Sequence, residues 1–139
     1  MKIDQYFWLY VLECEDGSLY TGYTKNLAIR YYQHRQGKQS ARYTRSFKPI
    51  RIAQCWTLFD SVGTALKVER FIKNQNRGTK LLWIENPERL KLRISKYVGR
   101  EILIFPFDTS LVEQESVKMD WRKVKNNFDP FSKISIASI

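Results

Sequence analysis

The sequence predicts an α/β fold of the α+β type, with helices flanking a small three-stranded sheet that is antiparallel or mixed. Two observations predict the sheet: an apolar run over residues 6–14 is typical of a central strand, and a turn then returns the chain as a second strand. Helical patterns bounded by capping residues give the order β-β-α-β-α-α. With 139 residues and 43% hydrophobic content, the chain is long enough for one ordinary core.

The turn between the first two strands decides which side chains share a face. Residues 15–17, Glu-Asp-Gly, fit a three-residue loop with the glycine in the left-handed position. In that register Tyr10 lies opposite Gly22 and Tyr20 opposite Leu12, so both tyrosines project from one face, roughly 7 Å apart. A two-residue loop would put them on opposite faces. Because Gly22 has no side chain, the space across from Tyr10 is expected to stay open for a water or a phosphate.

The next segment is predicted to be a helix that carries an arginine and a histidine. Asn26 is a plausible N-cap, residues 27–36 continue as the helix, and Gly37 suits the position after its last turn. Arg30 and His34 are four residues apart and therefore share one helical face.

The remaining elements follow from caps and chain breakers. Residues 37–49 are expected to form a basic loop, and residues 50–59 resume strand character. Asp60 or Ser61 caps a helix that contains Glu69. The later elements are expected in this order: a segment over 80–85 capped by Thr79, a basic amphipathic helix over 88–97, a short strand over 102–107 and a helix over 119–124. Residues 1–99 would form the domain, and residues 100–139 a C-terminal extension that packs on it or forms a contact surface.

Positive charge is concentrated in the first part of the chain. Residues 1–99 hold 18 Lys and Arg against 8 Asp and Glu, whereas residues 100–139 hold 6 of each. From Lys25 to Arg51 there are eight basic residues, interleaved with aromatic ones, and no acid. Such a composition is typical of phosphate binding. The alternative is a solvated basic face that only keeps the protein soluble.

Two further observations bound the class of protein. The two cysteines, Cys14 and Cys55, are far apart and lack zinc-ligand spacing, which favours buried free thiols. The first residues lack the plan of a signal peptide, and no apolar run approaches the length of a membrane span. A cytoplasmic protein with no membrane partner is therefore expected.

Five residues are candidate catalytic groups: Tyr10, Tyr20, Arg30, His34 and Glu69. Together they would supply a weak base, a cation for a pentavalent phosphorus and a metal ligand. Each has a structural alternative, since tyrosines on strands are usually core or rim residues and an Arg/His pair is often a solvated face.

Glu69 allows two interpretations. It precedes Lys73 by four residues, the favourable orientation for a helical ion pair. It also lies among apolar residues, where a carboxylate is costly unless a cation such as a divalent metal meets it.

As a set, these motifs resemble those of the GIY-YIG nuclease superfamily, most closely its short single-domain branch of predicted endonucleases of the UPF0213 type. Trp8-Leu9-Tyr10 and Tyr20-Thr21-Gly22 correspond to the two name-giving tripeptides. Residues 26–34, 38–45 and 65–73 correspond to the arginine helix, the basic loop and the glutamate helix. The sequence departs from the motifs at Trp8, Leu9 and Thr21, but it keeps the tyrosines and the glycine.

The resemblance implies hydrolysis of DNA with one divalent metal, Mg²⁺ or Mn²⁺, held by Glu69. Tyr10 would be the general base, with its phenol pKa lowered by surrounding cations. Tyr20 would bind the scissile phosphate or position the water, and Arg30 would grip the equatorial oxygens. His34 would orient the tyrosine and the water or assist as a base.

The expected partner is DNA, with branched or structured DNA and a targeting protein as further candidates, in repair or recombination. Nucleic-acid contacts are expected from Lys38, Arg42, Tyr43, Arg45, Lys48 and Lys73. Asn86 is a further candidate for contacting phosphate or supporting the site. One alternative function is a non-catalytic nucleic-acid-binding module that uses residues 25–51. Another is a scaffold that recruits a partner through the C-terminal extension.

Overall fold

The computed structural model describes residues 6–37, 42–124 and 129–131. Its elements in chain order are β1 (Phe7–Cys14), β2 (Leu19–Thr24), α1 (Leu27–Gln36), α2 (Arg42–Ser46), β3 (Pro49–Leu58), α3 (Val62–Lys73), α4 (Arg77–Glu85), the 3₁₀ turn η1 (Pro87–Arg89), α5 (Leu90–Val98), β4 (Ile104–Phe107) and α6 (Thr109–Lys118).

A four-stranded antiparallel sheet lies at the centre of the molecule, with the strand order β2-β1-β3-β4. The three-stranded sheet predicted from the sequence is therefore wrong. The additional strand, β4, pairs with β3 from Leu58 opposite Ile104 to Cys55 opposite Phe107. A pairing between segments so far apart in the chain has no turn that would fix its register, so the sequence pattern revealed the strand but not its partner.

The β1–β2 hairpin has the predicted register. Gly17 adopts a left-handed φ of 83°, and the Cys14 N–H donates to the Ser18 carbonyl over 2.9 Å. Tyr10 is opposite Gly22, and Leu12 is opposite Tyr20. Because side chains alternate along a strand, Tyr10 and Tyr20 share a face of the sheet, as expected.

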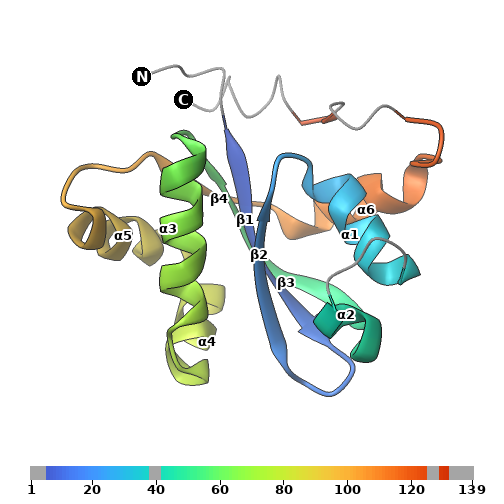
Figure 1. Ribbon diagram of the computed structural model, residues 1–139, viewed down its shortest axis with the longest axis horizontal. Helices are drawn as coiled ribbons and strands as arrows, with labels where there is room; N and C mark the ends of the chain where they lie inside the picture. The colour runs from blue at the N-terminus through green and yellow to red at the C-terminus, as the bar shows by residue number, and fades with distance from the viewer. Residues whose placement is uncertain (1–5, 38–41, 125–128, 132–139) are drawn as a thin grey trace.

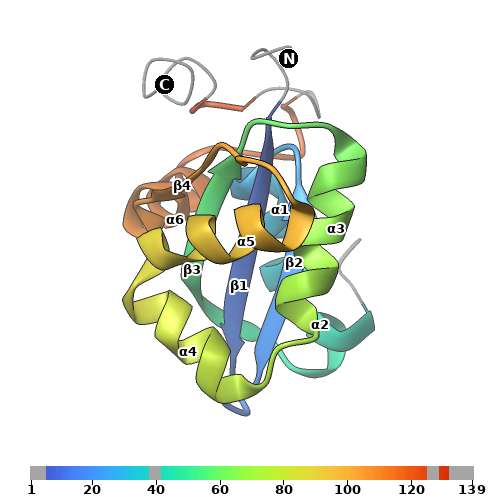
Figure 2. The ribbon, with the colours of Figure 1, turned by 90° about the vertical axis from the view of Figure 1, so that its left-hand side faces the viewer.

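Helices cover both faces of this sheet. Figure 1 shows α3, α4 and α5 on one side and α1, α2 and α6 on the other. Leu9 and Val11 of β1 pack in the core on the α3 side, whereas Trp8 and Leu12 pack in the core on the α1 side. In Figure 2, α3, α4 and α5 lie in front of the strands.

The helix boundaries confirm some predicted caps and change others. The Asn26 side chain accepts the Ile29 N–H at the start of α1, and the Ser61 side chain accepts the Thr64 N–H at the start of α3. Asn76, not Thr79, caps α4. The predicted basic loop contains the short helix α2.

The predicted helix over residues 119–124 is wrong, because the C-terminal helix lies earlier. The Asp108 side chain accepts the Ser110 N–H over 3.0 Å and caps α6. The chain then turns, and the buried Trp121 donates its indole N–H to the Ser116 carbonyl over 3.0 Å. Residues 119–124 lie in a turn because Trp121 packs back on the end of α6.

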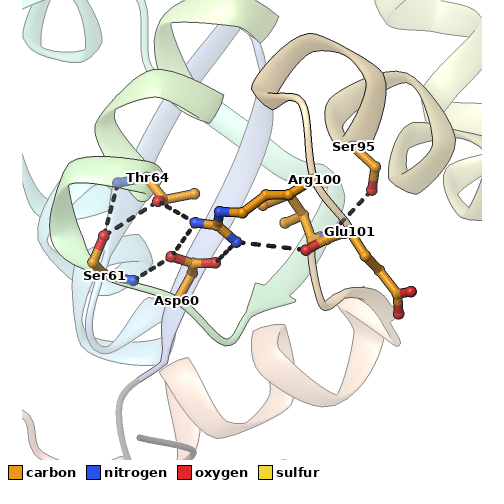
Figure 3. A network of polar contacts seen from close by, with 7 residues as sticks. Asp60, Ser61, Thr64, Ser95, Arg100 and Glu101 are labelled. Atoms are coloured by element: carbon orange, nitrogen blue, oxygen red, sulfur yellow. Dashed lines mark hydrogen bonds and ion pairs between the residues drawn. The ribbon is translucent and has the colours of Figure 1, made fainter. Parts of the chain in front are cut away.

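The segment after Gly99 is tied to the start of α3 (Figure 3). The Arg100 guanidinium donates to both carboxylate oxygens of Asp60, over 2.8 and 3.0 Å, and to the Thr64 hydroxyl over 3.2 Å. These hydrogen bonds, opposed by burial, lower the pKa of the Asp60 carboxyl to about 2. The helix that carries Glu69 is therefore anchored at its N-terminus by the later part of the chain.

Both cysteines are buried and free, as expected. Within the described ranges, no helix combines the length and apolar character needed to cross a bilayer.

Candidate active site

The two candidate tyrosines lie side by side on the α1 face of the sheet. Their ring centroids are 6.5 Å apart, and the His34 ring lies 5.9 Å from Tyr10 and 5.3 Å from Tyr20. Tyr10 is only 1% exposed, whereas Tyr20 and Arg30 are partly exposed. The site therefore has a buried layer, Tyr10 with His34, and an outer layer, Tyr20 with Arg30.

Gly22 makes room for the phenol of Tyr10. A Cβ atom at position 22 would lie 2.5 Å from the Tyr10 hydroxyl oxygen and 2.6 Å from Cζ, closer than real Cβ contacts. The expectation of an open space for water or phosphate opposite Tyr10 is therefore wrong, because the tyrosine ring fills that space itself. Glycine is needed on β2 because only a strand without a side chain at this point allows the ring to lie across it.

A chain of hydrogen bonds runs inward from the Tyr10 hydroxyl. That hydroxyl lies 3.0 Å from Nε2 of His34, and Nδ1 of the same ring lies 2.8 Å from the Thr44 hydroxyl. His34 is 0% exposed and Thr44 is 2% exposed. Helix α1 positions the imidazole, and α2 positions the threonine.

The electrostatics around Tyr10 oppose ionisation. Burial and the neighbouring Tyr20 raise the pKa of Tyr10 well above its usual value, and the charge of Glu69 adds to this effect. The positive charge of Arg30 lowers the pKa but does not compensate. The prediction that surrounding cations lower this pKa is therefore wrong, because desolvation of the phenolate outweighs one guanidinium.

Each of the other four candidates influences the Tyr10 phenol. Tyr20, Arg30 and Glu69 all act electrostatically on the Tyr10 phenol, and His34 is hydrogen-bonded to it. Glu69 belongs to α3, on the opposite face of the sheet from α1 (Figure 1). Arg30 belongs to α1, so these two candidates are carried by helices on opposite faces of the sheet.

His34 is neutral in this environment. Burial, and then the positive charge of Arg30, lower its pKa to about 3. A neutral imidazole has one N–H and one free lone pair, so it can accept a proton from Tyr10 only through an unprotonated Nε2.

Glu69 is partly buried and forms the predicted ion pair with Lys73. The Lys73 Nζ lies 3.4 Å from Oε1 of Glu69, and the two side chains are 46% and 17% exposed. The apolar stripe of α3 consists of Ala65, Val68 and Ile72. Val62 and Leu66 are exposed, so the surroundings of Glu69 are less apolar than the sequence pattern predicted.

The side chains near Glu69 fit one kind of metal ion. Across residues 6–37, 42–124 and 129–131, no group of three or more His, Cys, Asp or Glu could hold a metal. A lone carboxylate suits Mg²⁺, which keeps several waters and completes its shell with substrate phosphate oxygens. Mn²⁺ prefers the same oxygen ligands.

The predicted nucleic-acid contacts are only partly described. Tyr43, Arg45, Lys48 and Lys73 are exposed. Tyr43 stacks on Tyr20, with centroids 6.1 Å apart, and contacts Phe47 on α2's C-terminal side. Lys38 and the side chain of Arg42 lie outside the described residues. Asn86 donates its side-chain amide to the Leu82 carbonyl, where it supports the end of α4.

Thr44 is the member of the site that the sequence analysis missed. It lies in the segment predicted to be a loop, where only basic and aromatic residues were considered. A helical pattern over residues 42–46 would have indicated a fixed direction for its side chain, but five residues are too few for such a pattern to be recognised.

Comparison with known proteins gives a consistent result. The sequence model of the GIY-YIG catalytic domain matches residues 6–81, which include all five candidates. A UPF0213 protein of Syntrophus aciditrophicus is 42% identical over 84 residues, which are 60% of this chain and 95% of that protein. A UPF0213 protein of Cupriavidus pinatubonensis is 41% identical over 91 residues, which are 63% and 99% of the two chains.

Among solved structures, the solution NMR structure of a UPF0213 protein from Bacillus halodurans is 37% identical. It covers 58% of this chain and 84% of its own, with a TM-score of 0.38. Since the domain model spans more than half of the chain, this protein belongs to the GIY-YIG family and carries the nuclease-type catalytic domain of that family.

Proposed function

We propose that this protein is a metal-dependent endonuclease that hydrolyses DNA phosphodiester bonds by a one-metal mechanism. The observation that carries the proposal is the cluster of Tyr10, Tyr20 and His34 on one face of the sheet, where the charges of Arg30 and Glu69 act on the Tyr10 phenol. Phosphodiester hydrolysis needs a proton acceptor for water and cations for the charge that develops on phosphorus. This group of residues supplies both.

The outer layer of the site binds the phosphate. Arg30 offers a planar guanidinium with several N–H donors, which suits the equatorial oxygens of a pentavalent phosphorus better than an ammonium. Tyr20, partly exposed and beside Tyr10, donates its hydroxyl to a phosphate oxygen or holds the attacking water.

The inner layer accepts the proton of that water. Because a free phenolate is disfavoured, Tyr10 and His34 act as a pair: Tyr10 takes a proton from water while its own proton passes to Nε2 of His34. The products of this transfer are hydroxide, a neutral phenol and an imidazolium. The positive charge of Arg30 is one of the two causes that lower the pKa of His34. When Arg30 pairs with the substrate phosphate, this charge is partly neutralised and His34 accepts a proton more readily.

Glu69 would hold the divalent cation, Mg²⁺ or Mn²⁺, which would supply Lewis-acid stabilisation of the phosphate and the leaving oxygen. Lys73 would then exchange its contact with Glu69 for a substrate phosphate. Burial and the charge of Lys73 lower the pKa of Lys80. Such cations favour a polyanion.

The exposed side chains of Tyr43, Arg45 and Lys48 guide the nucleic acid to the site. Lys38 and Arg42 are further proposed contacts. Branched or structured DNA and a targeting protein are the candidate partners, in the cytoplasm. Residues 100–139 act as an extension of the domain formed by residues 1–99, which is supported by the pairing of β4 with β3 and by the contact of Arg100 with Asp60.

The alternative is a non-catalytic nucleic-acid-binding module that uses residues 25–51. Two observations favour it: Tyr10 is buried with a raised pKa, and Glu69 is already paired with Lys73. A site that had lost its catalytic activity would also have a buried tyrosine with a raised pKa and a paired glutamate.

Cleavage assays separate the two functions. The protein is incubated with supercoiled, linear and branched DNA in the presence of Mg²⁺, Mn²⁺ or EDTA. We expect cleavage that requires the metal, that Glu69→Gln abolishes, and that the exposed control Glu85→Gln retains. Retained DNA binding without metal-dependent cleavage by the wild type, at any ratio of protein to DNA, would support the binding module instead.

A further inference from the structure

The second hydrogen bond of His34 is made by a residue to which no role has been assigned. Thr44 lies on α2, is 2% exposed, and has its hydroxyl 2.8 Å from Nδ1 of His34. The other ring nitrogen faces the Tyr10 hydroxyl over 3.0 Å. Both ring nitrogens therefore meet a hydroxyl group, and each hydroxyl can act as donor or acceptor.

These contacts allow two arrangements of protons. In the first, Tyr10 donates to Nε2 and Nδ1–H donates to Thr44. In the second, Nε2–H donates to Tyr10 and Thr44 donates to Nδ1. Only the first leaves Nε2 able to accept a proton from Tyr10.

The buried Tyr10 hydroxyl distinguishes between the arrangements. Its one hydrogen-bond partner among the described residues is Nε2 of His34, so in the second arrangement the Tyr10 proton would be buried without an acceptor. The Tyr10 proton is then directed to Nε2, the imidazole nitrogen in contact with that hydroxyl. A neutral ring that accepts at Nε2 must carry its proton at Nδ1, where the Thr44 oxygen receives it.

We propose that Thr44 is a positioning residue of this site, whose hydroxyl oxygen accepts the Nδ1 proton of His34 and thereby keeps Nε2 free for the Tyr10 proton. The tautomer is a property of the folded chain; its consequence for catalysis rests on the proposed nuclease function. In the reaction, the imidazolium formed by proton transfer keeps its Nδ1–H bond to Thr44, so the ring need not turn. Thr44 thus acts on the direction of proton transfer through His34.

The tautomer can be observed directly because His34 is the only histidine of the chain. In protein labelled with ¹⁵N at histidine, the two ring nitrogens give distinct resonances according to which one carries the proton. For the wild type near pH 7 we expect protonated Nδ1 and unprotonated Nε2. A wild-type spectrum with protonated Nε2 overturns the inference without any variant.

Variants test whether Thr44 causes this preference. Thr44→Val keeps the shape and removes the acceptor, and we expect the Nε2–H form to become populated; Thr44→Ser should keep the wild-type spectrum. Thr21→Val is the matched control, because Thr21 is also 2% exposed and its Oγ1 has no hydrogen-bond partner among the described residues. An unchanged tautomer in folded Thr44→Val would also overturn the inference. If that variant does not fold, the wild-type and Thr44→Ser spectra still decide whether Nδ1 of His34 carries the proton.

Kinetics then connect the tautomer to the reaction. We expect Thr44→Val to lower kcat by about 10- to 100-fold with little change in KM, the range found when a group that orients a functional histidine is removed. Thr44→Ser should restore most of kcat, and Thr21→Val should leave it unchanged. If the wild type cuts no DNA, the proposed function fails while the spectra still decide the role of Thr44. If Thr44→Val shifts the tautomer but leaves kcat unchanged, the catalytic part of the inference is wrong.

Discussion

Both faces of the central sheet hold an apolar core, but the face under α1 also buries a hydrogen-bonded polar group. The face under α3, α4 and α5 is an apolar core that includes Leu9, Val11 and Trp56. The face under α1 and α2 buries Tyr10, His34 and Thr44, which are hydrogen-bonded to one another. Leu9 and Tyr10 are neighbours in β1, but Leu9 belongs to the apolar core and Tyr10 to the hydrogen-bonded group.

The two kinds of buried group contribute differently to the stability of the fold and to the geometry of the site. Each fully buried aliphatic side chain stabilises the fold by roughly 1.5–3 kcal/mol. A buried hydrogen bond contributes only about 1 kcal/mol net, because the same groups bind water in the unfolded chain, but it fixes direction. We therefore expect variants of the apolar face to lower stability, and variants of the polar face to lower activity more than stability. The following predictions test this contrast, from the largest expected effect to the smallest.

Arg30→Ala should lower kcat/KM for DNA cleavage by about 1,000-fold or more, because it removes the cation for the phosphate. DNA affinity should stay within about tenfold, since other basic residues provide most of the phosphate contacts. The control is Arg35→Ala on the same helix, whose exposed guanidinium lies 5.7 Å from the Tyr31 ring. If DNA binding and cleavage are lost in parallel, Arg30 is a simple phosphate contact and not a catalytic residue.

Leu9→Ala should lower the free energy of unfolding by about 3 kcal/mol, because Leu9 is fully buried and the variant leaves a cavity. The neighbouring variant Tyr10→Phe should cost only about 1–2 kcal/mol but should abolish cleavage. Urea unfolding and cleavage assays on the two proteins measure the contrast. Equal losses of stability would show that the two faces contribute alike.

Lowering the pH from 8 to 5 should cost about 2 kcal/mol of stability through His34. The folded pKa, about 3, lies below the unfolded value of 6.5, so only the unfolded chain binds a proton as the pH falls below 6.5. The stability that His34 provides is thus present above pH 6.5 and is lost progressively as the pH falls toward 3. Urea midpoints at both pH values, compared with His34→Gln, isolate this effect; the same pH dependence in the variant would assign it to other groups.

Gly22→Ala should lower stability by about 1–2 kcal/mol and also lower cleavage, because the added methyl group displaces the Tyr10 phenol. Gly63→Ala in α3 is the control: its new Cβ would meet nothing closer than Ser61 Oγ at 3.8 Å. That variant should be stabilised by up to about 1 kcal/mol, since alanine favours the helix. A Gly22→Ala protein with unchanged activity would mean that the position of Tyr10 can vary.

Much of this site could be predicted from local sequence, since its determinants are short-range. The left-handed Gly17 fixes the hairpin register and hence the common face of Tyr10 and Tyr20. The Asn26 cap and the four-residue spacing bring Arg30 and His34 onto one face of α1. Hydrogen bonds within a turn or a helix depend on neighbours in the chain, so residue type and spacing are enough to indicate them.

The remaining features depend on contacts between segments far apart in the chain. The tertiary structure added β4 to the sheet, put Thr44 against His34, and filled the space over Gly22 with the Tyr10 ring. It also raised the pKa of Tyr10, where the sequence suggested that nearby cations would lower it. Local sequence therefore indicated that Tyr10 and Tyr20 share one face and that Arg30 and His34 share another. Desolvation and contacts such as that of Thr44 depend on everything packed around a group, so only the fold determined them.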